Sequence, residues 1–193
     1  GEYMNVKMLA AAAALATCVP FAAQAQDDAR GGISFRGEAR IGYETPTVSG
    51  DGDVYKIGSA VSYGGELGVD FDAGGFSVGP YVNYEFSNVE LCDGGVCLSE
   101  KGNLSAGGRV GFAVGQGSQL FVKVGYASIE MEGSVPGYSA SESKSGIQGA
   151  IGATFDVGPH VYAMVEASYA DYGKFYDINL QRRQVAAGGG FRC

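Results

Sequence analysis

The segment ISFRGEARIGYE, residues Ile33–Glu44, alternates between apolar or small side chains and polar, mostly charged ones. Phe35, Ile41 and Tyr43 fall in one phase of this alternation, and charged residues fall in the other. Successive side chains of a β-strand point to opposite sides, so the segment predicts a strand with one apolar face and one charged face. The segment is longer than the usual strand of about 5–6 residues and suits a membrane-crossing strand of roughly 9–11.

The same pattern returns seven times, approximately at Gly58–Phe71, Phe76–Phe86, Asn103–Val114, Gln119–Ile129, Lys144–Phe155, His160–Tyr172 and Asn179–Cys193. Long polar loops are predicted after the first, third, fifth and seventh strands, at Thr45–Asp53, Ser87–Gly102, Glu130–Ser143 and from Gly173 to Asp177. Tight turns are predicted after the second, fourth and sixth. This alternation is typical of bacterial outer-membrane barrels. The sequence therefore predicts an all-β fold, an eight-stranded antiparallel up-and-down transmembrane β-barrel over residues 33–193. Pro80 lacks a ladder donor, so we expect a bulge there.

The start of the chain has the pattern of a cleaved signal peptide. An apolar run at Met8–Ala16 precedes the small-residue site Ala23-Gln24-Ala25. We expect residues 1–25 to be the signal peptide, with 1–3 upstream of Met4, and 26–32 to be a periplasmic lead. A lipoprotein signal ending at Cys18 is the weaker alternative, because Thr17 is a poor residue before the cysteine.

Composition excludes several classes of protein. Thirty-three glycines argue against a helical protein, since glycine weakens helices. The net charge of −8 argues against a nucleic-acid partner, which would favour a basic face.

Alternation alone does not say which face is inside, because a soluble lipocalin-like barrel shows the same period with its apolar face inward. Aromatic residues on the apolar face favour the membrane. Two girdles are predicted around an aliphatic belt, as a barrel needs at two lipid–water boundaries. The girdle near the tight turns comprises Phe35, Phe71, Phe76, Phe112, Phe155 and Phe191, and that near the long loops Tyr43, Tyr63, Tyr84, Tyr126 and Tyr169.

The charged face mixes both signs and is padded with glycine. In a narrow lumen, opposed charges would pair, because a buried charge without a partner is costly. The predicted lumen charge network is Arg36, Glu38, Arg40, Glu66, Glu85, Arg109, Lys123, Glu166 and Arg182.

Three stretches are closely similar to strands of a known family: Gly108–Phe112 (GRVGF), Leu120–Ala127 (LFVKVGYA) and Val165–Gly173 (VEASYADYG). On these the chain resembles the small outer-membrane β-barrel family of opacity-like surface antigens and the transmembrane domain of outer membrane protein A, in its alphaproteobacterial porin-like branch. The resemblance implies the bacterial outer membrane as location, outer-membrane lipid and lipopolysaccharide as surroundings, and no shared catalytic site. The end of the chain, QVAAGGGFRC, is similar to the family's C-terminal insertion signal, which implies the barrel assembly machinery as a partner. Cys193 stands where that signal normally ends in Phe.

Cys92 and Cys97 fall in one predicted loop of an exported chain, and a disulfide between them is expected. Cys193 is then left unpaired once Cys18 is removed with the signal peptide. His160, the only histidine, starts the seventh strand beside a predicted periplasmic turn and is expected to be interfacial rather than catalytic. No nucleophile–base pair, cofactor site or metal site is predicted, so the chain is not expected to be an enzyme.

Three functions follow from this sequence, in order of preference. The first is a structural surface protein that supports the envelope and displays four external loops, with its lumen filled by charged side chains. The second is a narrow porin-like channel for ions or small solutes. The third is an adhesin whose acidic loops bind a host or other surface ligand.

Overall fold

The computed structural model describes residues 32–50, 53–56, 59–87, 90–93, 96–135, 138–175 and 178–193, which form ten β-strands. Eight are long: β1 (Ile33–Gly50), β3 (Ala60–Asp72), β4 (Phe76–Ser87), β6 (Val96–Ala113), β7 (Ser118–Val135), β8 (Tyr138–Asp156), β9 (Val161–Phe175) and β10 (Ile178–Arg192). Two are short: β2 (Asp53–Lys56) and β5 (Glu90–Asp93). Within these ranges, no helix has the length and apolar character needed to span a membrane.

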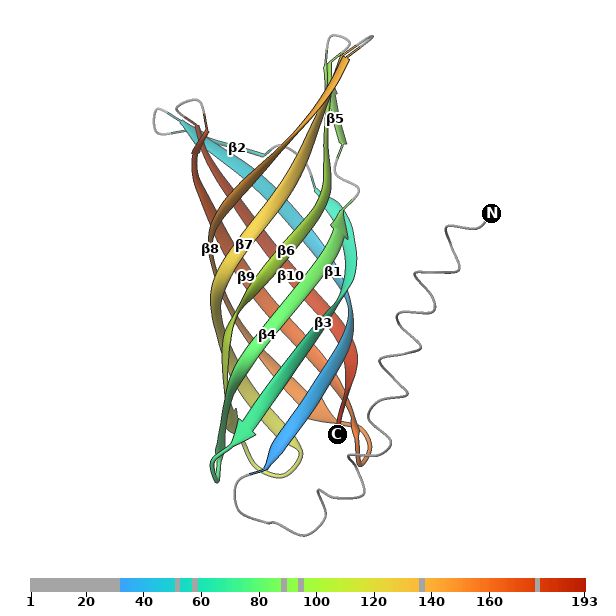
Figure 1. The fold of residues 1–193 in the computed structure, drawn as a ribbon, viewed down its shortest axis with the longest axis vertical. Helices are drawn as coiled ribbons and strands as arrows, with labels where there is room; N and C mark the ends of the chain where they lie inside the picture. Colours follow the sequence, from blue (N-terminus) through green and yellow to red (C-terminus); the bar gives the residue numbers. More distant parts are fainter. Residues whose placement is uncertain are drawn as a thin grey trace, which may run out of the picture.

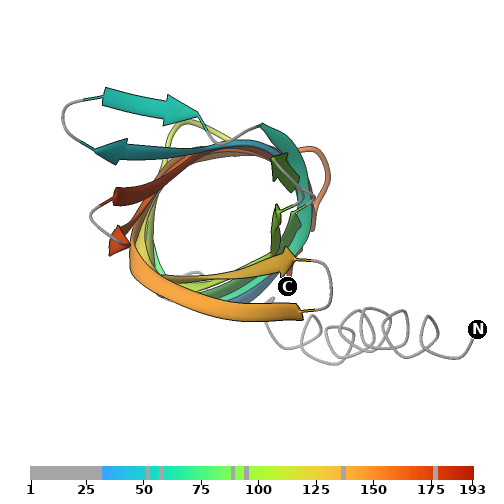
Figure 2. The same cartoon turned by 90° about the horizontal axis from the view of Figure 1, so that it is seen from above.

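The eight long strands form one closed barrel (Figure 1). Each pairs antiparallel with the next long strand along the chain. The ring closes because β10 also pairs with β1, from Arg192 opposite Arg36 to Asn179 opposite Ser49 (Figure 2). Closure leaves no strand edge unpaired around the ring. This is the eight-stranded up-and-down architecture that the sequence predicts.

The two ends of the barrel differ. At one end, short turns at residues 73–75, 114–117 and 157–160 join neighbouring strands, and the C-terminus lies there too (Figure 1). Gly74 and Gly75 have φ angles of 70° and 116°, which side-chain-bearing residues rarely adopt, so glycine is required in this turn. The turns lie where the sequence predicts them.

At the other end the strands run on as hairpins, which corrects the prediction of irregular loops. β6 and β7 stay paired as far as Cys97 opposite Ser134, and β7 and β8 as far as Val135 opposite Tyr138. The predicted loops Ser87–Gly102 and Glu130–Ser143 are therefore largely strand. Similarly, β1 continues to Gly50 and pairs with β2. The hairpin sequences do not keep the regular alternation of apolar and charged residues, so this signal is lost there, whereas backbone hydrogen bonds extend any ladder whose neighbour is present.

The bulge expected at Pro80 is also wrong. The register between β3 and β4 is the same on both sides of it, with Gly68 opposite Tyr81 and Phe71 opposite Val78. A Cβ on Gly79 would lie 1.6 Å from the Val69 carbonyl oxygen. The two backbones therefore approach closely beside the proline, and glycine accommodates the missing donor without an inserted residue.

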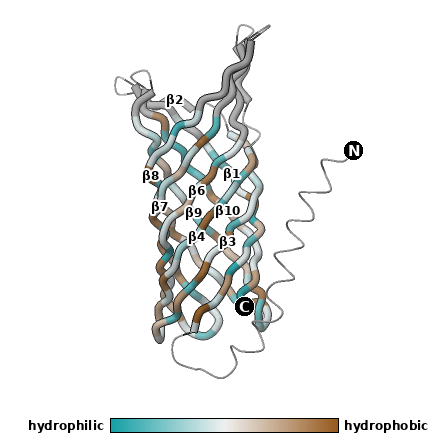
Figure 3. Tube along the Cα trace, in the orientation of Figure 1, coloured by the Kyte–Doolittle hydropathy of each residue, from teal (hydrophilic) through white to brown (hydrophobic). Residues whose placement is uncertain are grey.

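The charged face of the strands is inside. Arg36 and Glu66 are 2% and 1% exposed, whereas Val124 and Val165 are 62% and 48% exposed. Hydrophobic and hydrophilic positions accordingly alternate along the strands (Figure 3). A soluble barrel would have the opposite arrangement, because apolar surface is favourably removed from water. The lipocalin-like alternative is excluded.

Candidate functional site: an ion-paired lumen

Glu66, on β3, lies at the centre of the charges that fill the barrel. Its carboxylate accepts hydrogen bonds from Arg36 Nη1 at 2.7 Å and Arg40 Nη1 at 2.8 Å, both from β1. Lys123 Nζ, from β7 across the lumen, donates to Glu66 Oε2 at 2.6 Å. Residues far apart in the sequence meet here because closure brings β1, β3 and β7 around one axis.

The network continues from this centre across the lumen. Arg40 also contacts Glu166 Oε1 at 2.5 Å and Glu85 Oε1 at 3.0 Å. Lys123 lies 2.6 Å from Glu166 Oε2. Arg36, Arg40 and Lys123 thus each have at least two carboxylate partners, which offsets the desolvation cost of burying the charges.

Towards the hairpin end, Arg182 connects two carboxylates. Its Nη2 lies 3.0 Å from Glu85 Oε2, and it also pairs with Glu44. The Gln184 amide donates to Glu85 Oε2 at 2.6 Å, so the network ends in neutral hydrogen bonds on this side.

Towards the tight turns, Asp70 is shared by two arginines. Its Oδ2 lies 3.2 Å from Arg36 Nε and 3.2 Å from Arg109 Nη1. Arg36 also pairs with Glu38 at 2.8 Å, and Glu38 accepts a hydrogen bond from the Tyr162 hydroxyl at 2.8 Å.

Aromatic side chains fill the space that the ion pairs leave. Lys123 Nζ lies 4.6 Å from the centre of the Tyr81 ring, and Arg109 Cζ lies 4.5 Å from the centre of the Phe121 ring. A Cβ on Gly152 would lie 2.3 Å from Phe121 Cζ. Inward-facing glycine therefore makes the room that a bulky neighbour occupies, which explains the glycine padding of the charged face.

All nine residues predicted for the lumen are buried and joined through these contacts. The prediction omitted Glu44 and Asp70, which are as deeply buried as the rest. Both were detectable, because each lies in phase with a predicted lumen residue on the same strand: Glu44 with Arg40, and Asp70 with Glu66.

The predicted girdle residues lie on the outer face. Ten of the eleven are large exposed side chains: Phe35, Phe71, Phe76, Phe112, Phe155, Tyr43, Tyr63, Tyr84, Tyr126 and Tyr169. Phe191 is partly covered, and its ring lies over Gly37, where a Cβ would be 3.1 Å from Phe191 Cε1. Phe76 lies directly opposite Phe112 beside the tight turns.

The cysteines and the histidine lie away from the lumen network. Cys92 of β5 is directly opposite Cys97 of β6. Directly opposite Cα atoms are about 4.5–5.5 Å apart, within the range of a disulfide. Cys193 is disulfide-bonded in the full chain of 193 residues. The expectation of an unpaired Cys193 concerns the chain after removal of Cys18 and stays a prediction. His160 is exposed, with Nδ1 3.2 Å from the Arg192 carbonyl oxygen beside a tight turn. In the part of the chain that the structure describes, no cluster of three or more metal-ligating residues occurs.

The family model for the outer membrane protein beta-barrel domain matches residues 9–191. The chain belongs to this family. As an outer-membrane β-barrel it resides in the bacterial outer membrane, where hydrocarbon contacts its apolar exterior. Comparison with curated proteins gives no match.

Solved structures of outer-membrane barrels share the fold. The attachment invasion locus protein Ail of Yersinia pestis, solved with the heparin analogue sucrose octasulfate, is 18% identical with a TM-score of 0.58. The match covers 82% of this chain and 99% of Ail. Neisserial surface protein A is 14% identical with a TM-score of 0.56, covering 83% and 98% of the two chains. OprG of Pseudomonas aeruginosa is 8% identical with a TM-score of 0.53, covering 85% and 97%. At these identities the likeness concerns the fold alone.

Proposed function

We propose that this outer-membrane β-barrel is a non-conducting structural protein that supports the envelope and displays its hairpins outside the cell. The observation that carries the proposal is the continuous ion-pair network across the lumen, from Asp70 and Arg109 to Glu44 and Arg182. An eight-stranded barrel is just wide enough for side chains to fill it. An ion crossing the barrel would have to separate buried pairs at several successive levels, and each separation is costly.

Planar-bilayer recordings of the refolded chain test this proposal against the porin-like alternative. We expect no steady conductance from the wild-type barrel. A double variant that truncates two lumen aromatics, Tyr81→Ala with Phe121→Ala, should conduct measurably, since both rings lie in the buried cross-section. The altered gel mobility of an unboiled barrel verifies that each sample is folded. A large, steady conductance of the wild-type chain would refute the plug and favour the pore.

A second candidate, a surface-binding role, is favoured by the projecting sheet. We define this sheet as residues 90–93 of β5, 96–102 of β6, 130–135 of β7 and 138–146 of β8, which pair in that order. β8 pairs with β9 from Ile147 onward, whereas its pairing with β7 begins at Tyr138, so the β7–β8 ladder continues beyond the end of the β8–β9 ladder. The projecting sheet therefore extends past the ring of eight strands at the hairpin end of the barrel.

The charge of the projecting sheet restricts its partner. Its acidic residues are Glu90, Asp93, Glu100, Glu130, Glu132 and Glu142, and its basic ones are Lys101 and Lys144. A polyanion like the heparin analogue bound by Ail is therefore disfavoured, and a basic surface is favoured. Removal of residues 88–101 should weaken adhesion to a polylysine-coated surface and leave barrel folding intact. Unchanged adhesion would count against the role.

Two further partners are proposed from the chemistry of the hairpins and of the last strand. Acidic hairpins would contact lipopolysaccharide through bridging divalent cations, and the C-terminal strand would be recognised by the barrel assembly machinery. The mature chain would begin at Gln26 after signal-peptide cleavage, which N-terminal sequencing of the membrane form tests. The proposal assigns the chain no catalytic role.

A further inference from the structure

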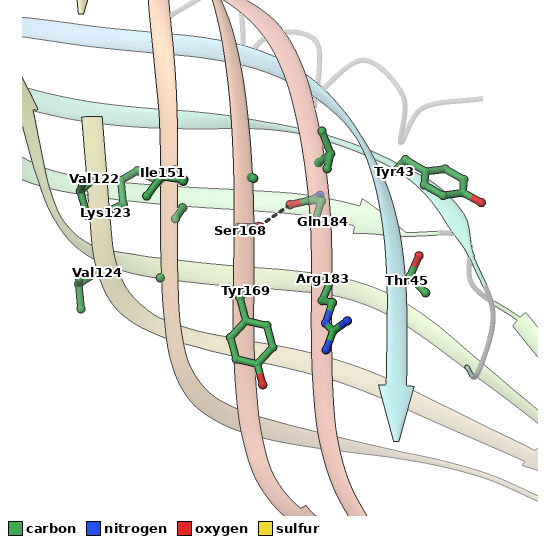
Figure 4. A pocket seen from close by; sticks show the side chains of 14 residues that line it. Tyr43, Thr45, Val122, Lys123, Val124, Ile151, Ser168, Tyr169, Arg183 and Gln184 are labelled. Atoms are coloured by element: carbon green, nitrogen blue, oxygen red, sulfur yellow. Dashed lines mark hydrogen bonds between the residues drawn. The ribbon is translucent and has the colours of Figure 1, made fainter. Parts of the chain in front are cut away.

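A shallow depression with a volume of about 660 Å³ lies on the outer face of the barrel, across β7, β8, β9, β10 and β1 (Figure 4). One row of it runs through Val124, Gly149, Tyr169, Arg183 and Thr45, each opposite the next on the neighbouring strand. The depression is therefore a feature of the strand register and not of a mobile loop.

Small residues give the depression its depth. Gly149 lies between Val124 and Tyr169, and the nearest atom to a Cβ placed on it is 3.9 Å away. In the next row, Ala167 lies between Ile151 and Val185. These small residues form a depression between branched and aromatic side chains on a surface that contacts hydrocarbon. A flexible acyl chain has the shape and the apolar character to fill it.

Arg183 places a positive charge at the margin of this apolar surface. Its side chain is exposed, points outward and lies opposite Tyr169 of the aromatic girdle. Within the described part of the chain it forms no ion pair. A lipid-facing arginine is tolerated near the membrane boundary, where it meets lipid headgroups, and guanidinium binds phosphate through paired hydrogen bonds.

We propose that the depression holds one acyl chain of a phosphate-bearing membrane lipid and that Arg183 binds the phosphate of the same lipid. A second copy of the chain fits less well. A two-fold contact centred here would bring two Arg183 side chains together, and like charges at an interface oppose association. The inference does not depend on whether the lumen conducts.

Native mass spectrometry of the full refolded chain in neutral detergent tests the site. The probe is phosphatidylglycerol; the comparators are diacylglycerol with the same chains and inorganic phosphate. We expect one tightly bound phosphatidylglycerol per barrel, weaker binding of diacylglycerol, and no competition by inorganic phosphate at equal concentration. Arg183→Gln should weaken phosphatidylglycerol binding about tenfold, as for one charge-assisted contact, and Arg183→Lys should restore part of it.

Filling the depression tests the acyl-chain half of the site. Ala167→Leu should weaken binding of both lipids, whereas Ala39→Leu, at another exposed outward-facing alanine outside the depression, should change neither. Gel mobility before boiling verifies that each variant is folded. The proposal is overturned if Arg183→Gln binds phosphatidylglycerol as tightly as wild type, if Ala167→Leu has no effect, or if inorganic phosphate alone displaces the lipid. It is equally overturned if the wild-type barrel dimerises through this face in place of binding lipid.

Discussion

Replacing Glu66 by glutamine should destabilise the barrel more than any other single neutralisation in the lumen. Glutamine keeps the shape of the side chain and one carbonyl acceptor, but it removes the charge that faces Arg36, Arg40 and Lys123. Breaking a buried ion pair by removing one partner costs about 3–5 kcal/mol. The three cations keep other carboxylates, such as Glu166 at 2.6 Å from Lys123, so we expect a loss near the lower end, about 3 kcal/mol.

The assay is urea unfolding of the refolded barrel in lipid vesicles, with the folded fraction read from gel mobility without boiling. The matched control is Glu130→Gln, which removes the same charge from an exposed position and should change stability by less than about 0.5 kcal/mol. The double variant Glu66→Gln with Lys123→Met should lose less free energy of unfolding than the sum of the losses of the two single variants. We expect a coupling free energy of about 1 kcal/mol or more. Equal midpoints for Glu66→Gln and Glu130→Gln would refute the inference that Glu66 joins the network.

Three further predictions concern the rest of the barrel. Val165→Arg places a charge in the aliphatic belt and should cost about 2–4 kcal/mol in the same unfolding assay; a loss below about 0.5 kcal/mol would mean that water reaches this position. Gly79→Ala would put a methyl carbon 1.6 Å from a backbone oxygen of β3 and should impair refolding, whereas Gly108→Ala, with nothing within 4 Å, should be tolerated. If both variants refold equally well, the close approach is not required. Peptide mapping without reductant should recover Cys92 linked to Cys97, and alkylation of both as free thiols would exclude that disulfide.

The period-two pattern predicts the strands and their two faces, because each long strand borders hydrocarbon on one side and a charged lumen on the other. The alternation of long loops and tight turns predicts the barrel, and the aromatic residues indicate which face is outside. That contrast extends only over the membrane. Outside the membrane, paired hairpin residues such as Glu130 and Ser143 can both be polar. The sequence pattern therefore does not reveal that the hairpins are strands. The sequence also gives no register, and the register decides whether a proline such as Pro80 produces a bulge.

The sequence predicts which charged residues face the lumen, but not which ion pairs they form. Phase places Arg40 and Glu66 on one face, but only closure brings Glu66 beside Lys123 and Glu44 beside Arg182. The outer depression could not be inferred from alternation, since it arises from Gly149 and Ala167 lying in adjacent rows of different strands. Those positions follow from strand register alone.

Met164 and Val165 are neighbours in the chain and should contact different surroundings: Met164 is 1% exposed and points into the lumen, and Val165 is 48% exposed and points outward. Nuclear Overhauser measurements on the methyl-labelled chain in lipid nanodiscs can detect contact with acyl-chain protons at each residue. We predict strong lipid contacts at the Val165 methyls and none at the Met164 methyl. Lipid contacts at Met164, or water in place of lipid at Val165, would show that the barrel is not arranged with its charges inside and its aliphatic side chains in the membrane.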